Sequence, residues 1–217
     1  MTTKTYNQYC AIAHALDIVG ERWSLLVIRN LLIAPQRFSD LRRGLPGVST
    51  NILADRLKLL EKHGVITTRY LPPPAASTVY KLTEHGRGLT KTLTALARWG
   101  SVMLGEPKEG QAVVTESVGF MLQGVFWRDA YLDLELSCNV RVNDKIYEQT
   151  FGVKLGPNGV ELVDPLREPD IEIRAGLEPL NLLSSRQRRL DELVAVNAVE
   201  IVGSEEKVRS LSAWVTA

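Results

Sequence analysis

Short polar side chains stand together at one place in this sequence, Ser49-Thr50-Asn51, directly after the turn-forming pair Pro46-Gly47. Three leucines follow at the spacing of one buried helix face: Leu53, Leu57 and Leu60. The pattern predicts a helix that Ser49 caps and that ends at His63, before Gly64. Hydroxyl and amide groups at its leading end can hydrogen-bond base edges in a major groove about 12 Å wide, and its N–H groups attract phosphate. Solvated side chains and a plain cap remain the alternative.

Positively charged residues surround this predicted helix. The candidates for contact with phosphates or bases are Arg37, Arg42, Arg43, Arg56 and Arg69. Ser39 joins them as the predicted cap of a short helix over residues 40–44. Arg56 follows on a helix face that the leucines leave free, and Arg69 falls in a predicted hairpin that can reach a minor groove. Together with Ser49-Thr50-Asn51 they form the candidate DNA-binding set.

A thiol, an imidazole and a carboxylate share one predicted helix face, because Cys10, His14 and Asp17 follow at i, i+4 and i+7. A protonated His14 would lower the pKa of the Cys10 thiol and make it reactive. The same pair offers two metal ligands, but no second Cys/His pair at metal spacing accompanies it. The sequence therefore favours a structural role for Cys10, keeps redox activity as a hypothesis and predicts no metal site.

The elements that position these residues follow one order in the first half of the chain. Helices are predicted at residues 10–19, from 21 or 22 to 33, at 40–44, 49–63 and 83–104, and strands at 65–71 and 78–82. Thr83 is the predicted cap of the last helix. Helices, a tight turn, a longer helix, a hairpin and a closing helix are the order of a winged helix-turn-helix. Arg22 and Arg29 are expected either to pair with Glu21 and Asp17 or to lay their aliphatic stems along a helix interface with the charge in water.

The net charge of +1 conceals two opposite halves. Residues 1–105 hold 14 lysines and arginines against 6 acidic residues, a net charge of +8. Residues 106–217 hold 12 against 19, a net charge of −7. This asymmetry indicates that the first half faces a polyanion. We expect a DNA-binding domain at residues 1–105, a linker at 106–115 that is rich in Gly, Pro and charge, and a second domain at 116–217.

Several sequence segments of the first half carry a family pattern. They are Cys10, LDIVGERWSLLVIR (16–29), RFSDL (37–41), LPGVS (45–49), NIL (51–53), RL (56–57), GVI (64–66), VYKLT (79–83) and Gly86. With them, residues 10–100 resemble the HxlR-type branch of the MarR-like winged-helix regulators. The resemblance implies a homodimer built from the first and last helices of the domain, which binds a pseudo-palindromic operator in double-stranded DNA. Some members of that family sense oxidants or electrophiles through a cysteine at the position of Cys10.

The second half reads as an α+β sheet with flanking helices. We expect a helix or irregular strand at 116–128, strands at 130–142, 146–155, 160–163, 171–175 and 200–203, and helices from 179, at 189–196 and at 205–214. Asn143-Asp144 is the predicted hairpin turn. The segments PDIEI (169–173), LNLL (180–183) and EIVGS (200–204) make residues 117–216 similar to a sterol-carrier-protein-type domain. That likeness implies an apolar cavity, and the arginine cluster at 186, 188 and 189 departs from the family pattern.

Composition narrows the class of protein. No run of 18 apolar residues or secretory signal is found, and two cysteines fit a reducing compartment, so we expect a cytoplasmic protein without a membrane segment. No catalytic constellation, glycine-rich nucleotide loop or cofactor motif stands out, and an enzyme is not expected. The leading interpretation is a homodimeric transcription regulator whose second domain binds an apolar effector or only supports the dimer. The alternative is an apolar-ligand carrier or interaction protein whose helix-turn-helix does not bind DNA.

Overall fold

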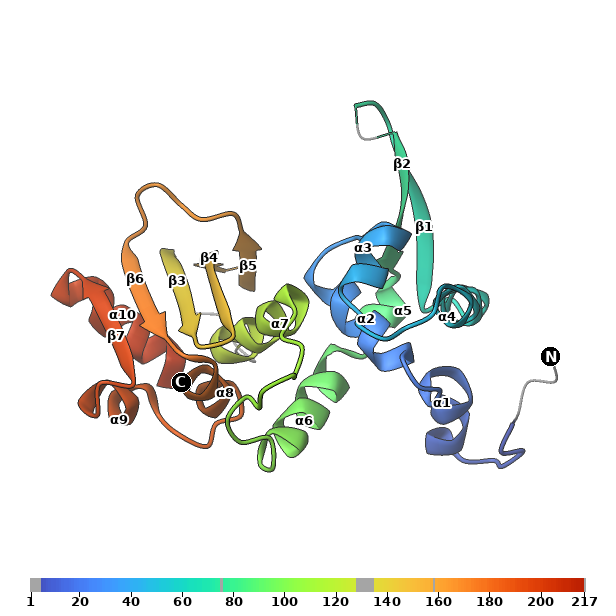
Figure 1. The fold of residues 1–217 in the computed structure, drawn as a ribbon, viewed down its shortest axis with the longest axis horizontal. Helices are drawn as coiled ribbons and strands as arrows, with labels where there is room; N and C mark the ends of the chain where they lie inside the picture. Colours follow the sequence, from blue (N-terminus) through green and yellow to red (C-terminus); the bar gives the residue numbers. More distant parts are fainter. Residues whose placement is uncertain (1–4, 75, 128–134, 158, 217) are drawn as a thin grey trace. The chain divides into compact units, whose positions relative to one another are not determined.

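The computed structural model describes residues 5–74, 76–127, 135–157 and 159–216 (Figure 1). It divides into two compact units, residues 1–93 and 94–217, and helix α6 (Thr90–Ser101) crosses the division. None of the helices within the described ranges is long and apolar enough to cross a membrane.

The first unit is a winged helix-turn-helix, as predicted. Its elements are α1 (Ala11–Val19), α2 (Ser24–Ile33), α3 (Phe38–Arg43), α4 (Thr50–Lys62), β1 (Ile66–Leu71), β2 (Ser77–Leu82) and α5 (Glu84–Arg87). The Ser49 hydroxyl accepts a hydrogen bond from the Ile52 N–H at 3.3 Å, which confirms the predicted cap of α4. His63 closes α4 and Gly64 follows with φ +66°, a left-handed conformation that glycine adopts at little cost. The leucines of α4 are buried as predicted.

Two helix starts differ from the prediction. Neither Glu21 nor Arg22 begins α2, because Trp23 has a left-handed φ of 82° and is the N-cap, so the helix begins at Ser24. Ser39 does not cap α3, because the Arg37 carbonyl already accepts from the N–H groups of Asp40 and Leu41 at 3.1 and 3.0 Å. The helix therefore begins at Phe38, and Ser39 lies inside its first turn.

The predicted helix over residues 83–104 is interrupted. Thr83 does cap it, by accepting from the Gly86 N–H at 3.1 Å, but α5 ends at Arg87 and α6 begins at Thr90. The Thr90 hydroxyl donates to the Arg87 carbonyl at 2.6 Å, an acceptor that residue 91 would use in a continuous helix. Gly86 is required here, because a Cβ at this position would lie 2.1 Å from the Val65 carbonyl oxygen.

The wing is an antiparallel hairpin whose register runs from Ile66 opposite Leu82 to Leu71 opposite Ser77. A third segment joins it at one residue. Gln36 and Tyr80 exchange two backbone hydrogen bonds, at 3.0 and 2.7 Å. The chain between α2 and α3 is thereby tied to the base of the wing.

The second unit is a mixed sheet covered by helices, as predicted. Its elements are α7 (Thr115–Phe126), β3 (Leu136–Asp144), β4 (Tyr147–Gly156), β5 (Gly159–Val163), β6 (Ile171–Ala175), α8 (Leu177–Ser184), α9 (Leu190–Ala195), β7 (Val199–Gly203) and α10 (Glu205–Thr216). The strand order is β5-β4-β3-β6-β7, with only β3 and β6 parallel. Helices α7, α8 and α10 contact strands of this sheet and enclose one apolar core with it (Figure 1).

The structure decides or corrects the predictions for α7, for the β3–β4 turn and for the start of β3. Residues 116–128 were open between helix and strand, and α7 is a helix. The turn predicted at Asn143-Asp144 is wrong: both residues pair with β4, opposite Glu148 and Tyr147, and the turn follows at residues 145–146. Of the strand predicted from residue 130, residues 130–134 lie outside the described residues, and β3 begins at Leu136.

Polar side chains in this unit are tied to the backbone. Asn139 is buried, donates to the Leu166 carbonyl at 2.9 Å and to Glu172 at 3.0 Å, and accepts from the Leu166 N–H at 2.9 Å. Asp170 accepts from the backbone N–H and the hydroxyl of Ser137, each at 2.8 Å. These bonds fix the segment between β5 and β6 to β3.

Candidate nucleic-acid interface

The leading end of α4 presents the short polar residues that the sequence singled out. Ser49, Thr50 and Asn51 are all exposed. The side of the helix opposite Asn51 is closed by Leu53, Leu57 and Leu60, of which none is more than 2% exposed. Packing of the leucines therefore fixes which side of α4 faces solvent, and the first turn stands free on that side.

Two further residues continue this outward side of α4 and were not singled out from the sequence. Asp55 and Lys58 are exposed and follow Asn51 at i+4 and i+7. A carboxylate accepts from cytosine N4, and an ammonium donates to guanine O6 and N7. The i, i+4, i+7 spacing from Asn51 is the signal that would have found them.

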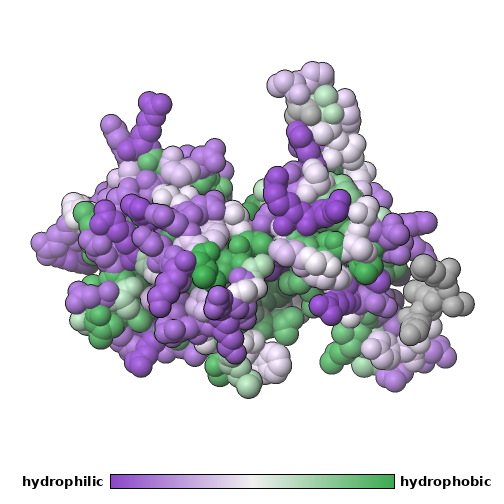
Figure 2. Space-filling model, viewed as in Figure 1, coloured by the Kyte–Doolittle hydropathy of each residue, from purple (hydrophilic) through white to green (hydrophobic). Residues whose placement is uncertain are grey.

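The predicted arginines around α3 and on the wing are exposed. Arg42 and Arg43 lie in the last turn of α3, Arg37 at its N-cap and Ser39 in its first turn. Arg43 forms an ion pair with Asp40 at 2.8 Å, and 78% of its side chain remains in solvent. Hydrophilic side chains cover α3 beside the base of the wing (Figure 2). Arg69 is exposed on β1, next to the exposed ring of Tyr70.

Arg56 is placed differently from the other candidates. Its side chain is 20% exposed, and its Nη2 lies 3.4 Å from Glu21 Oε2. The Nε atom is buried and lacks a hydrogen-bond partner within the described ranges. The expected pairing of Arg22 with Glu21 is wrong, because Glu21 faces Arg56 and the Arg22 guanidinium lies 5.3 Å from the centre of the Trp23 ring.

Cys10 is exposed at the N-cap of α1 and makes no side-chain cap bond. His14 is exposed on the next turn, while Asp17 accepts from the Thr5 hydroxyl at 2.8 Å and the Tyr6 N–H at 3.0 Å. The other thiol differs: burial, followed by the nearby Asp170 carboxylate, raises the pKa of Cys138 to about 12. No group of three His, Cys, Asp or Glu side chains in the described parts of the chain could hold a metal ion.

Large apolar side chains are uncovered on two helical segments. On α1 and just before it, Tyr9, Ile12 and Leu16 are exposed, Ile12 to 73%. On α6 and just after it, the exposed residues are Leu96, Trp99, Val102, Met103 and Leu104, with Trp99 at 78%. Contiguous exposed apolar side chains commonly mark an interaction surface.

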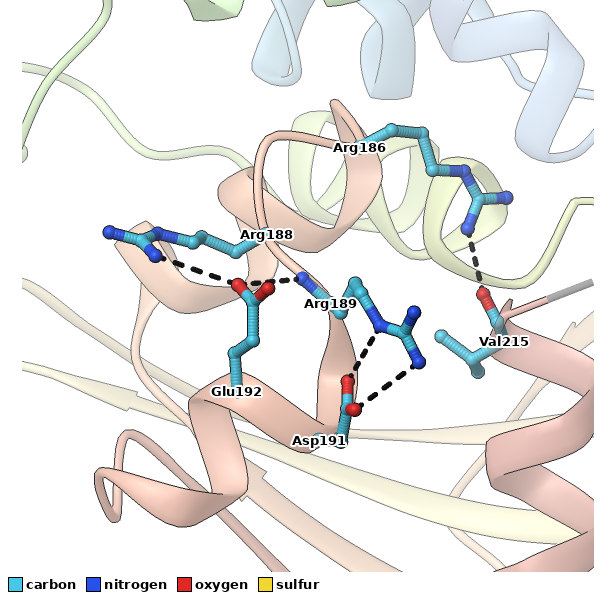
Figure 3. Close-up of polar contacts among 6 residues, drawn as sticks. All are labelled: Arg186, Arg188, Arg189, Asp191, Glu192 and Val215. Carbon is cyan, nitrogen blue, oxygen red and sulfur yellow. Dashed lines mark hydrogen bonds and ion pairs between the residues drawn. The ribbon is translucent and has the colours of Figure 1, made fainter.

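The arginine cluster of the second unit is engaged inside that unit (Figure 3). Arg186 has φ +63° and donates to the carbonyls of Val215 and Trp127, each at 3.0 Å. Burial, and next to it the charge of Arg98, lowers the pKa of Arg186. Arg188 pairs with Glu192 at 3.5 Å and Arg189 with Asp191 at 3.0 Å. The cluster thus ties the turn after α8 to its surroundings.

Comparison with known proteins relates the first half of the chain to a family of helix-turn-helix proteins. Residues 18–108 match the family model described as HxlR-like helix-turn-helix. The uncharacterized HTH-type transcriptional regulator sll1512 of Synechocystis sp. is 38% identical over 92 residues, which are 42% of this chain and 68% of that protein. The uncharacterized HTH-type transcriptional regulator YvaP of Bacillus subtilis is 36% identical over 87 residues, which are 40% of this chain and 81% of that protein.

A solved structure, the reduced form of the transcriptional regulator YodB from B. subtilis, aligns at 28% identity with a TM-score of 0.40. It covers 46% of this chain and 100% of that chain. The fold of the first unit, the family model and the two sequence relatives sll1512 and YvaP define a winged helix-turn-helix protein of the transcription-regulator class. The chain belongs to the HxlR-like helix-turn-helix family through its N-terminal half.

Proposed function

We propose that this protein is a homodimeric transcription regulator that binds a pseudo-palindromic site in double-stranded DNA. The observation that carries the proposal is the exposed leading end of α4, Ser49-Thr50-Asn51, on a helix whose leucine face is buried. A helix of this kind enters the major groove with its N-terminal residues on base edges. The residues that contact phosphates around it are Arg37, Ser39, Arg42 and Arg43. On the wing, Arg69 contacts the minor groove.

The proposed dimer forms through the uncovered apolar residues of α1 and α6. Transferring apolar surface out of water contributes about 25 cal/mol per Å², so side chains such as Ile12 and Trp99 favour a partner copy. Ile12→Glu is expected to give a monomer in sedimentation velocity while circular dichroism stays unchanged. A wild-type protein that sediments as a monomer at all concentrations would contradict this part of the proposal.

We further propose that the second unit is a sterol-carrier-protein-like domain that takes up a small apolar effector. Its support is the sheet and helices around one apolar core. An effector changes DNA binding only if its affinity differs between two states of the dimer. A panel of fatty acids, sterols and apolar aromatics is therefore tested for shifts in melting temperature and operator affinity. If none changes either quantity, the unit has a supporting role only.

Oxidant control through Cys10 is part of the same proposal and rests on the exposure of this thiol at the start of α1. Peroxide is expected to lower operator affinity in the wild type and to leave a Cys10→Ser variant unaffected. Iodoacetamide should label Cys10 faster than it labels a thiol in an unstructured peptide. Equal labelling rates and an unchanged affinity after peroxide would remove the redox role.

The decisive experiment is selection of the purified protein against a random duplex library, followed by a salt titration on the enriched site. Neutralised phosphates release counterions, so a real interface loses affinity steeply as salt rises. We expect a two-fold symmetric site and a steep salt slope. Absence of any enriched sequence, with weak and salt-insensitive binding, would instead assign the chain to the carriers or interaction proteins.

A further inference from the structure

The corner between α1 and α2, residues 20–23, contacts the helix-turn-helix. It is tight, since a Cβ on Gly20 would lie 2.5 Å from the Leu16 carbonyl oxygen. Trp23 completes it in a left-handed conformation that costs a non-glycine residue energy. Its ring lies against the turn before α4, because a Cβ on Gly47 would be 3.8 Å from ring atom Cη2. The first contact thus joins the corner to the turn.

The second contact joins the corner to α4 itself. Glu21 pairs with Arg56 across 35 positions in the sequence, and the two side chains are unequally exposed, 51% for Glu21 and 20% for Arg56. The Arg56 guanidinium therefore packs against the protein, and the Glu21 carboxylate lies on its solvent side. The salt bridge thus joins the corner to α4 outside its leucine face.

The helical angle separates Arg56 from the outward side of α4. At 100° per residue, Arg56 lies about 65° from the middle of the leucine face, whereas Asn51 and Lys58 lie more than about 130° from it. A side chain on this flank, folded toward α1 and α2, is poorly directed toward bases that Asn51 and Lys58 would face.

We propose that Glu21 and Arg56 are a positioning pair: the carboxylate fixes the guanidinium, and the guanidinium fixes the angle at which α4 is presented. The proposal rests on the proposed function in that α4 reads DNA. Arg56 then supports DNA affinity without touching DNA. Because α1 carries part of the proposed dimer surface, the same pair connects the dimer helix to the reading helix.

The first test is independent of DNA. Hydrogen exchange of the α4 amides is measured in wild type and in Glu21→Gln, which keeps the size of the side chain and removes its charge. We expect the amides of the second half of α4 to exchange about threefold faster, the upper range for a partly exposed pair. Glu148→Gln, which breaks the exposed pair of Glu148 with Arg141 in the second unit, is the matched control. Unchanged exchange in Glu21→Gln would overturn the proposal.

The second test is a double-mutant cycle on the selected operator. Glu21→Gln should weaken binding about threefold and Arg56→Ala about tenfold, with the double variant no weaker than Arg56→Ala alone. The salt slope and the preference at every base position should stay as in the wild type. Arg56→Lys, which keeps the charge, should recover part of the affinity, and melting temperatures verify that each variant is folded.

Three results would overturn the positioning role. A salt slope that falls by about 1 in Arg56→Ala would place Arg56 on a phosphate, and relaxed preference at one base pair would place it on a base. A higher affinity in Glu21→Gln would make Glu21 a competitor of DNA for Arg56. If the wild type selects no sequence at all, the proposed function fails, while hydrogen exchange still decides whether the pair holds α4.

Discussion

The leading end of α4 in the first unit and the strands of the second unit use their polar side chains in opposite ways. At the leading end of α4, Thr50 and Asn51 are exposed, and no side-chain hydrogen bond of either is found among the described residues. In the second unit, Asn139 bonds three groups at once, and Asp170 accepts twice from Ser137. A polar group that is already bonded must lose those bonds before it can bind anything else. Thr50 and Asn51 therefore need not break a side-chain hydrogen bond to contact a ligand, whereas Asn139 and Asp170 stabilise the fold of the second unit.

The largest effect is expected from Trp214→Ala, which should destabilise the second unit. Trp214 is fully buried and donates from Nε1 to the Phe126 carbonyl at 2.8 Å. Its truncation should lower the free energy of unfolding of the second unit by about 3–5 kcal/mol, measured by urea denaturation followed by circular dichroism. Trp99→Ala, at an exposed position, is the control and should change it by less than about 0.5 kcal/mol at concentrations where the chain is monomeric. Equal losses in both variants would contradict the assignment of the core.

Asn139→Ala tests whether a bonded polar side chain is structural. The substitution leaves the N–H and the carbonyl of Leu166 without their partner, and it should cost about 1–3 kcal/mol of stability. Asn143→Ala, at an exposed position of the same strand, should be nearly neutral. A stable Asn139→Ala variant would show that the bonds to Leu166 are dispensable.

Asn51→Ala and Lys58→Ala test the opposite behaviour in the first unit. Asn51→Ala should cost about 1–3 kcal/mol of binding to the selected operator and relax the preference at one base pair. If Lys58 contacts phosphate, Lys58→Ala should lower the salt slope by about 1. Both should leave the melting temperature within about 1 °C of the wild type, since neither side chain forms a hydrogen bond or ion pair with another described residue. A loss of stability in place of affinity would make this end of α4 resemble the second unit.

The smallest expected effect is a pH dependence at Asp170. Hydrogen bonds from the backbone and hydroxyl of Ser137, and then Lys207, hold the pKa of this carboxyl below its ordinary value of 3.8. The stability that Asp170 contributes is therefore complete above that value and is lost as the pH falls through the lowered pKa. Asp170→Asn should flatten the fall in melting temperature between pH 5 and 3, and Glu168→Gln should not. Identical profiles in all three proteins would remove Asp170 as a contributor.

The sequence predicted best where one residue type decides a local structure. Ser49 and Gly64 set the two ends of α4, and the leucine spacing set its buried face, so the helix that carries the candidate site was predicted almost to the residue. The spacing of apolar residues, together with caps and turn residues, extended this to the order of elements in the first half. The boundaries in the second unit were predicted within a few residues wherever apolar and polar side chains alternate.

The remaining features depend on contacts between distant residues. Gln36 joins the wing through its backbone, which no side-chain pattern reveals. Asn143 and Asp144 favour a turn by type, but pairing with β4 outweighs that local preference, and Asp144 instead accepts from the Leu177 N–H at 3.2 Å. The partner of Arg56 lies 35 positions away, so the sequence indicated a free arginine where the structure has a paired one.

The position of Trp23 has a spectroscopic consequence. Its indole is partly buried at the corner that holds α4, beside Gly47 and under the guanidinium of Arg22. Indole emission responds to solvent and to nearby charge, so a chain in which the other three tryptophans are replaced by phenylalanine would carry one fluorophore at this corner. Its emission maximum and quenching would report, in solution and in real time, whether DNA, an oxidant or an apolar compound changes the surroundings of Trp23 beside α4.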